Sequence, residues 1–224
     1  MLNFIKKNKW KIIISSIVTL LPIVAGLLLW DSLPDMVPSH WGPTGEVDGY
    51  SSKTFFVFGL PFIMLGMNLL CTVAAGLDPK HKNNEGKLLI LVYGIIPSLS
   101  ILLSVVTYFS ALDLPLPVMN LIVAAFGLMF VLIGNYLPKC KQSYTIGIKI
   151  SWTLNSEKNW VATHRMSGKL WVICGALIIL SALLPANLVI WFVLPILAIS
   201  IIVPFVYSYV YYVKYDRGES GDEN

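Results

Sequence analysis

The chain has 224 residues, of which 56% are hydrophobic and only 12% are charged. Soluble domains carry about 25% charged residues, so this composition excludes a water-soluble globular protein. The net charge of +4 comes from basic residues split among four short segments, which argues against a nucleic-acid-binding face.

Six uncharged runs are candidates for membrane-spanning helices, because a bilayer core about 30 Å thick needs roughly 20 apolar residues. The fifth run is the shortest, and it shares a tight turn with the sixth. The sequence predicts an all-α, polytopic membrane protein with about six transmembrane helices in one bundle. The runs cover residues 12–30, 54–77, 88–112, 118–137, 170–185 and 187–213.

The first run follows the basic start MLNFIKKNKWK, which also fits the beginning of a signal peptide. The run is long, however, and it ends at Trp30 and Asp31 without a small-x-small cleavage site. We therefore expect it to be retained as the first helix.

Residues 31–53, between the first two runs, are rich in proline and glycine, so we expect a compact, structured loop. His40 and Asp48 fit either a metal-binding or proton-sensing pair, or a hydrogen bond that shapes the loop. The loop holds no second histidine and no cysteine, which favours the hydrogen bond. Trp41 and Tyr50 are suited to the level of the lipid headgroups.

The six apolar runs contain no Asp, Glu, Lys, Arg or His. Ion-coupled pumps and proton relays usually need an ionisable group at depth, which counts against a proton-coupled transporter. Asn68 lies in the second run, and Ser100, Ser104 and Thr107 share one face of the third. We expect these side chains to form interhelical hydrogen bonds, with a substrate path as the alternative.

The other long connection covers residues 138–168. Asn155 or Ser156 suits a helix N-cap, and Glu157 then falls in the first turn, where the helix dipole favours an acid. A short helix is therefore expected to begin here, and its basic neighbours suit the headgroup region.

That short helix would carry Trp160 and His164 on one face, four residues apart. Residues 144–152 have β-branched side chains around Gly147 and are expected to be extended. This extended stretch would either pack beneath the helices or offer an edge to a partner protein.

The basic residues predict the orientation of the chain. Lys53 is the only one of the 16 expected on one side, which also holds five acidic residues. The positive-inside rule therefore places both termini in the cytoplasm. The other 15 are Lys6, Lys7, Lys9, Lys11, Lys80, Lys82, Lys87, Lys139, Lys141, Lys149, Lys158, Arg165, Lys169, Lys214 and Arg217.

Enzyme motifs are missing from the sequence: we find no His-Glu-x-x-His, Gly-x-Ser-x-Gly or Walker loop. The three cysteines are widely spaced and are interpreted as packing residues. We therefore expect no enzyme activity and no catalytic, cofactor-binding or metal-binding residue.

Two motifs carry a resemblance to known families. His40 and Trp41, followed by Gly45, Asp48 and Gly49, resemble an N-terminal module of unassigned function in Gram-positive membrane proteins. The stretch GIKISWTLNSEKNWVATHRMSG resembles the signature of the SdpI family, and LDPK at the end of the second run fits the same pattern.

Two positions depart from that pattern: Lys149 and Ser151 stand where arginine and proline are expected. Lysine cannot form the planar bidentate pair that arginine forms, so a role in clamping an anion is not implied at Lys149.

The resemblance implies an immunity protein of the bacterial plasma membrane. Such a protein would resist a secreted, membrane-active peptide and would signal to a cytoplasmic repressor. The alternative is a small-molecule or peptide transporter. Expected partners are the bilayer, a toxin peptide outside and a repressor inside, without direct nucleic-acid binding. Candidate partner-binding residues are His40, Trp41, Gly45, Asp48, Gly49, Trp152, Thr153, Glu157, Trp160, His164 and Arg165.

The implied organisation has three parts. An N-terminal membrane module covers residues 1–112, an SdpI-like module covers residues 113–213, and residues 214–224 form a polar tail that is expected to be disordered.

Overall fold

The computed structural model describes residues 2–79 and 87–217 of the chain. The chain packs as two compact units. We call the first the N-terminal unit, and the other the C-terminal unit. The expected module boundary at residues 112 and 113 stays a prediction. The N-terminal unit comprises Met1–Leu77, Leu89–Ile122 and Leu184–Leu188, and the C-terminal unit comprises Asp78–Leu88, Val123–Leu183 and Val189–Asn224.

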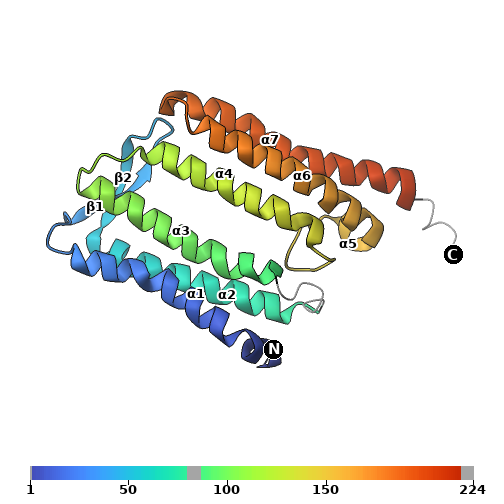
Figure 1. Cartoon of the computed structure of the whole chain (residues 1–224), viewed down its shortest axis with the longest axis horizontal. Helices are drawn as coiled ribbons and strands as arrows, with labels where there is room; N and C mark the ends of the chain where they lie inside the picture. The colour runs from blue at the N-terminus through green and yellow to red at the C-terminus, as the bar shows by residue number, and fades with distance from the viewer. Residues whose placement is uncertain (1, 80–86, 218–224) are drawn as a thin grey trace. The chain divides into compact units, whose positions relative to one another are not determined.

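Among the described residues, five helical stretches are long and apolar enough to cross a membrane. They match the first four and the sixth of the expected runs, so the prediction of an all-α membrane protein is confirmed (Figure 1). The helices that form them are α1 (Leu2–Leu28), η1 (Phe55–Gly59) with α2 (Leu60–Leu77), α3 (Lys87–Ala111), α4 (Val118–Tyr136) with η3 (Leu137–Lys139), and α7 (Ala186–Tyr211) with η4 (Tyr212–Asp216).

The fifth expected run differs from the structure. The sequence predicted a short helix and then a separate span at 170–185, but the chain forms one continuous helix, α6 (Glu157–Ser181). About six spans were expected, whereas five helices in the described part of the chain meet the length and composition of a membrane span. The apolar stretch of α6 is short because its first half carries charged side chains, namely Glu157, Lys158, Arg165 and Lys169.

The expected disordered tail at 214–224 is described only in part. Helical structure continues to Asp216 in η4, and residues 218–224 lie outside the described residues.

Residues between α1 and η1 form an antiparallel hairpin of β1 (Met36–Trp41) and β2 (Val47–Ser52) (Figure 1). The strand register shifts between Pro38 and His40 and again between His40 and Trp41, and such bulges bend and twist a strand pair. The buried side chain of Val37 anchors the hairpin, because it packs in one apolar cluster with Leu33, Phe56, Val57 and Tyr108.

Asn68 and Ser100 join helices of the N-terminal unit, as the sequence predicted. The Asn68 amide donates to the Ser15 hydroxyl at 3.0 Å, and the Ser100 hydroxyl donates to the Thr19 carbonyl at 2.9 Å. Both bonds link different helices. The Ser104 hydroxyl bonds within α3 instead, to the Ser100 carbonyl. These partners explain how polar groups are accommodated among apolar helices.

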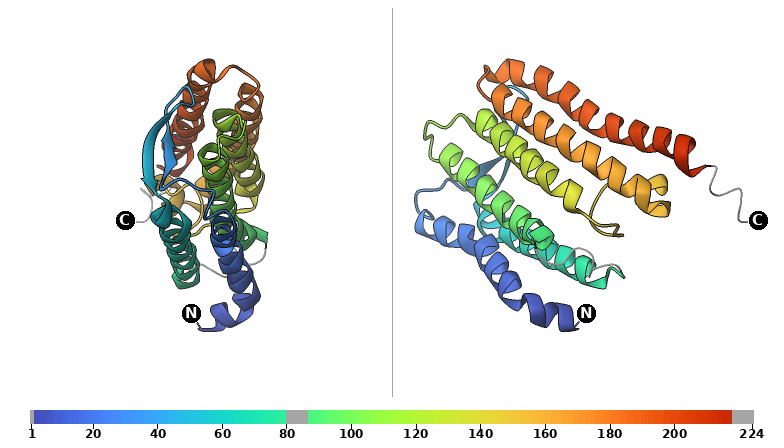
Figure 2. Two further views of the ribbon diagram at one scale, coloured as in Figure 1. Left: turned by 90° about the vertical axis from the view of Figure 1, so that its left-hand side faces the viewer. Right: turned by 45° about the vertical axis from the view of Figure 1, so that its right-hand side comes forward.

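In the C-terminal unit, α4, α6 and α7 run side by side (Figures 1 and 2). Close approach of α4 and α6 depends on glycine. A Cβ atom at Gly127 would lie 2.8 Å from the Gly175 carbonyl oxygen, and one at Gly134 would lie 2.9 Å from the Gly168 carbonyl oxygen. Small residues at helix contacts let the backbones approach each other in membrane proteins.

Candidate functional site

The candidate residues of the hairpin include an exposed pair. His40 Nδ1 lies 2.5 Å from Asp48 Oδ1, and both side chains are largely exposed to solvent. The pair joins β1 to β2 and therefore supports the interpretation of a hydrogen bond that shapes the loop. Among the described residues, no three His, Cys, Asp or Glu side chains come close enough together to hold a metal ion.

Two positions of the hairpin require glycine for steric reasons. A Cβ atom at Gly49 would lie 2.9 Å from the Cβ of His40 on the opposite strand. Gly45 has a φ of 91°, in the region that favours glycine over residues with a side chain. Two of the five hairpin candidates, Gly45 and Gly49, are therefore explained by backbone geometry.

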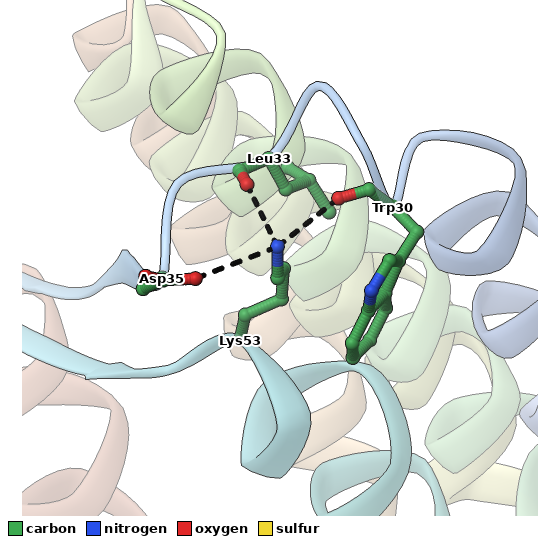
Figure 3. A network of polar contacts seen from close by, with 4 residues as sticks. All are labelled: Trp30, Leu33, Asp35 and Lys53. Carbon is green, nitrogen blue, oxygen red and sulfur yellow. Dashed lines mark hydrogen bonds and ion pairs between the residues drawn. The ribbon is translucent and has the colours of Figure 1, made fainter.

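Lys53 fastens the end of the hairpin to the end of α1 (Figure 3). Its ammonium group donates to the carbonyl oxygens of Trp30 at 3.1 Å and Leu33 at 3.0 Å. It also lies 4.8 Å from the centre of the Trp30 ring. Asp35 is a distant partner at 3.7 Å with a fully exposed side chain. Sequence reasoning used Lys53 only as a charge and missed this anchoring role.

In the C-terminal unit, α6 begins as predicted, with Ser156 as its N-cap. The Ser156 hydroxyl accepts a hydrogen bond from the Asn159 backbone N–H at 3.1 Å. The prediction of an extended stretch at 144–152 is wrong for most of its length, because residues 144–147 form bends and the short helix α5 (Ser151–Asn155) begins inside it. Ile150, just before α5, does have extended backbone.

His164 is buried and has both ring nitrogens engaged. Nδ1 lies 2.8 Å from the Trp160 carbonyl oxygen, which can only accept, so Nδ1 carries the hydrogen. Nε2 is then an acceptor, and it receives the backbone N–H of Ile148 at 2.9 Å. Burial lowers the pKa of His164 to about 4. The imidazole therefore stays neutral at physiological pH and ties Ile148 to α6.

Trp160 is fully buried beside His164, with the two rings stacked 4.0 Å apart. The Trp160 indole N–H donates to the Cys140 carbonyl at 2.7 Å. Burial, and then the charge of Asp78, raise the pKa of the Cys140 thiol to about 12, so this thiol stays protonated. Trp160 and His164 together hold both ends of the loop that precedes α6.

Gly147 permits the loop to cross over these rings. Its φ is 121°, and a Cβ atom there would lie 2.6 Å from His164 Nε2 and 2.7 Å from the Trp160 ring. Position 147 therefore requires glycine for two reasons: the backbone conformation disfavours a side chain, and the neighbouring rings leave no space for one.

Thr153 is also buried and organises the turn into α5. Its hydroxyl lies 2.7 Å from the Ile148 carbonyl oxygen and 2.9 Å from that of Ile150, and it accepts the Ile150 N–H at 3.2 Å. Gln142 donates to the Thr153 carbonyl from the other side of the loop. Thr153 thus acts on the backbone of its own segment.

Asp78 holds the start of this loop, a contact that the candidate residues did not include. Its Oδ2 atom accepts from the hydroxyls of Ser143 at 2.6 Å and Thr145 at 2.7 Å. The backbone N–H groups of Tyr144 and Thr145 also donate to it. The only sequence signal for Asp78 was the LDPK match to the family pattern.

Three further candidates sit closer to the surface of the C-terminal unit. The Trp152 ring packs against Phe205 and Tyr209 at centroid distances of 5.2 Å and 5.0 Å. Glu157 and Arg165 are exposed on α6. The structure therefore divides the motif into a buried set that shapes the loop and an exposed set that is open to contact.

The comparisons with known proteins agree with both motifs. Residues 139–208 match the model of the SdpI/YfhL protein family, and residues 17–65 match a domain of unknown function, DUF1648. The chain is also similar to the Immunity protein SdpI of Bacillus subtilis (strain 168), with 27% identity over 215 residues. That alignment covers 93% of this chain and 97% of the relative. No solved structure gives a significant match. The chain therefore carries a segment that matches the SdpI/YfhL protein family, with a DUF1648 segment ahead of it, and it is similar to a named immunity protein along nearly its full length.

Proposed function

We propose that the protein is an immunity protein of the bacterial plasma membrane that protects its cell from a secreted, membrane-active peptide. The observation that carries this proposal is the similarity to a relative named as an immunity protein, over nearly the full length of both chains. In the part of the chain that the structure describes, five helices long and apolar enough to cross a membrane agree with such a location.

The proposed orientation has both termini in the cytoplasm and the hairpin outside. It is supported by the charges, because 15 of the 16 basic residues fall in segments that share one side. The exception is Lys53, which binds backbone carbonyls at the end of α1. In this orientation the hairpin lies on the side from which a secreted peptide arrives.

The hairpin then offers its exposed side chains to the peptide. His40, Asp48 and Tyr50 are exposed, whereas Val37 anchors the strand below them. Recognition by exposed side chains on a rigid support is a common arrangement for binding sites on loops. His40, Trp41 and Asp48 are the hairpin residues proposed to contact the peptide.

We also propose that the protein signals to a cytoplasmic repressor, and that the exposed residues of the C-terminal motif make this contact. Glu157 and Arg165 are open to contact on α6, and in the proposed orientation they face the cytoplasm. A repressor would be retained at the membrane by contacts with these side chains.

The immunity proposal is tested by deleting the gene and growing the deletion strain in medium conditioned by its parent. Cell survival and membrane potential should both fall, and a plasmid copy of the wild-type chain should restore them. Equal survival and equal potential in deletion and parent strains would reject the proposal.

The orientation is tested with single cysteines in a variant that lacks Cys71, Cys140 and Cys174. Thr44→Cys lies at the exposed tip of the hairpin, and Asn155→Cys lies at the exposed end of α5. A membrane-impermeant maleimide should label the first in intact cells and the second only after lysis. The reverse pattern would show that the orientation is inverted.

A further inference from the structure

An apolar pocket of about 310 Å³ lies in the C-terminal unit, between α7 and the stretch that precedes α5. Its volume is at the lower end of the range for ligand pockets, roughly 300 to 1,000 Å³. Part of its wall is the family motif itself. The lining residues are Ile148, Ile150, Trp171, Ser200, Ile201, Ile202, Pro204 and Phe205.

Proline creates the local break in α7 that forms one wall. Pro204 has no N–H, so the Ser200 carbonyl four residues earlier loses its usual helix partner. The Trp171 indole N–H of α6 supplies the missing hydrogen bond at 3.0 Å. The Trp171 ring is thereby held at the pocket beside the interrupted turn.

The polar groups of the lining already have partners. The Ser200 hydroxyl donates to the Leu197 carbonyl at 2.7 Å, and the Ser200 carbonyl is taken by Trp171. The backbone N–H groups of Ile148 and Ile150 bond His164 and Thr153. An ordered water needs two to four polar partners, so this lining favours an apolar occupant.

The surroundings of the pocket identify that occupant as hydrocarbon. On α7, the side chains of Ile201, Ile202 and Phe205 are 67%, 57% and 51% exposed, in a helix apolar enough to cross a membrane. Such a surface is suited to contact with lipid. We therefore expect the pocket to open toward acyl chains.

The aromatic residues nearby set the depth of the pocket. Trp152 packs against Tyr209 and lies 6.3 Å from Tyr212, and aromatic rings of this kind gather at the headgroup level. Phe205 lies four residues before Tyr209, and Ser200 lies twelve residues before Tyr212, which corresponds to about 6 Å and about 18 Å along a helix. The pocket is thus within reach of a chain whose headgroup sits among the rings.

We propose that this pocket binds one acyl chain of a membrane phospholipid. The bound chain contacts Ile148 and Ile150 and so supports the loop that His164 and Thr153 hold from the other side. The proposal concerns lipid binding and does not depend on the immunity function.

The test uses the full chain in nanodiscs that contain a phosphatidylglycerol with a diazirine in its acyl chain. After irradiation, mass spectrometry locates the adducts. Adducts should concentrate on residues 148–150 and 200–205, above the level at Leu194, which is 53% exposed on α7 outside the pocket.

Two variants fill the pocket, and a third serves as the control. Ile201→Trp and Ile202→Trp should each lower the adducts at 148–150 by at least about tenfold, equivalent to 1.4 kcal/mol. Ile199→Trp changes an exposed α7 side chain that does not line the pocket, and it should leave the adducts unchanged.

Adducts that merely follow exposure along α7, or an equal loss in the Ile199→Trp control, would overturn the proposal. So would adducts at 148–150 that persist in both pocket-filling variants.

Discussion

The hairpin at 31–53 and the loop at 138–168 are alike in composition. Each carries a dense motif of aromatic, histidine, acidic and glycine residues. Their histidines are placed in opposite ways. His40 is exposed and bonded to an exposed acid. His164 is buried, neutral and bonded to two backbone groups. The motif histidine is thus exposed and available for contact in one region, whereas it supports the backbone in the other.

This difference changes what a mutation can reveal. In the loop at 138–168, Trp160, His164 and Thr153 support each other and the backbone. In the hairpin, the glycines and Val37 hold the fold while His40 and Asp48 remain open. A variant in the loop that loses function is therefore expected to be misfolded first of all. A hairpin variant at His40 or Asp48 that loses function is expected to have lost a contact with a partner.

Trp160→Ala has the largest expected effect. The fully buried ring and its hydrogen bond to Cys140 are lost, and such truncations cost about 3–5 kcal/mol. Because the ring is buried, the protein level in the membrane should fall together with any protection. Denaturant unfolding in detergent micelles measures the change, and Val161→Ala, an exposed neighbour on α6, should be near neutral. A normal unfolding curve for Trp160→Ala would contradict the structural role.

Gly147→Ala should follow closely. The methyl group would meet His164 and Trp160 in a backbone conformation that disfavours a side chain, with an expected cost of about 3 kcal/mol. Gly66→Ala is the matched control, because a Cβ atom there has nothing within 4 Å. Equal thermal stability of the two variants would show that the loop can shift without strain.

The pH dependence of His164 should be comparable in size. Its folded pKa of about 4 lies below the ordinary value of 6.5, so the unfolded chain binds the proton first as pH falls. Stability contributed by the neutral ring is full above pH 6.5 and is lost toward pH 4, by up to about 3 kcal/mol. Unfolding free energies measured across this range test the sign.

His164→Gln is the variant for that experiment, because its amide oxygen can still accept the Ile148 N–H but does not titrate. Its stability should be lower at pH 7 and flatter between pH 6.5 and 4. An unchanged slope would assign the acid sensitivity to another group.

Lys53→Met should destabilise the hairpin by about 2 kcal/mol, since two carbonyl oxygens at the end of α1 lose a charged donor. Asp35→Asn should change little, because that side chain is fully exposed and 3.7 Å away. Limited proteolysis within 31–53 distinguishes the two variants. Equal cleavage rates in the two variants would contradict the proposed anchoring through the carbonyl contacts.

His40→Ala and Asp48→Asn should have the smallest effect on stability, under about 1 kcal/mol, as for other exposed ion pairs. If the hairpin contacts the peptide, protection should nevertheless fall while the membrane level stays normal. Glu46→Gln, which alters an exposed acid outside this pair, serves as the control. Full protection in both variants would remove the pair from the proposed contact surface.

Most of the membrane-spanning helices could be predicted from the sequence, because a long uncharged run in a bilayer has few alternatives to a helix. The runs behind α1, α2, α3, α4 and α7 were all found this way. The continuity of α6 was not predicted, because its charged first half and apolar second half look like separate elements when only hydropathy is considered.

The candidate residues were recognisable as motifs, but their roles were not. Sequence spacing placed Trp160 and His164 on one helix face. It did not reveal that this face points into the unit, nor that Asp78 holds residues 143–145 of the same loop through four groups. Those contacts join residues 65 to 67 positions apart, beyond the reach of local pattern.

By itself, the sequence determined that this is a membrane protein, because burying its apolar runs requires hydrocarbon. It also carried the motifs that resemble the SdpI family. Only the tertiary structure decided which motif side chains are available. The exposure of a side chain depends on which residues pack against it, and Gly147 and Ile148 pack against His164. No local sequence pattern around His164 encodes this packing.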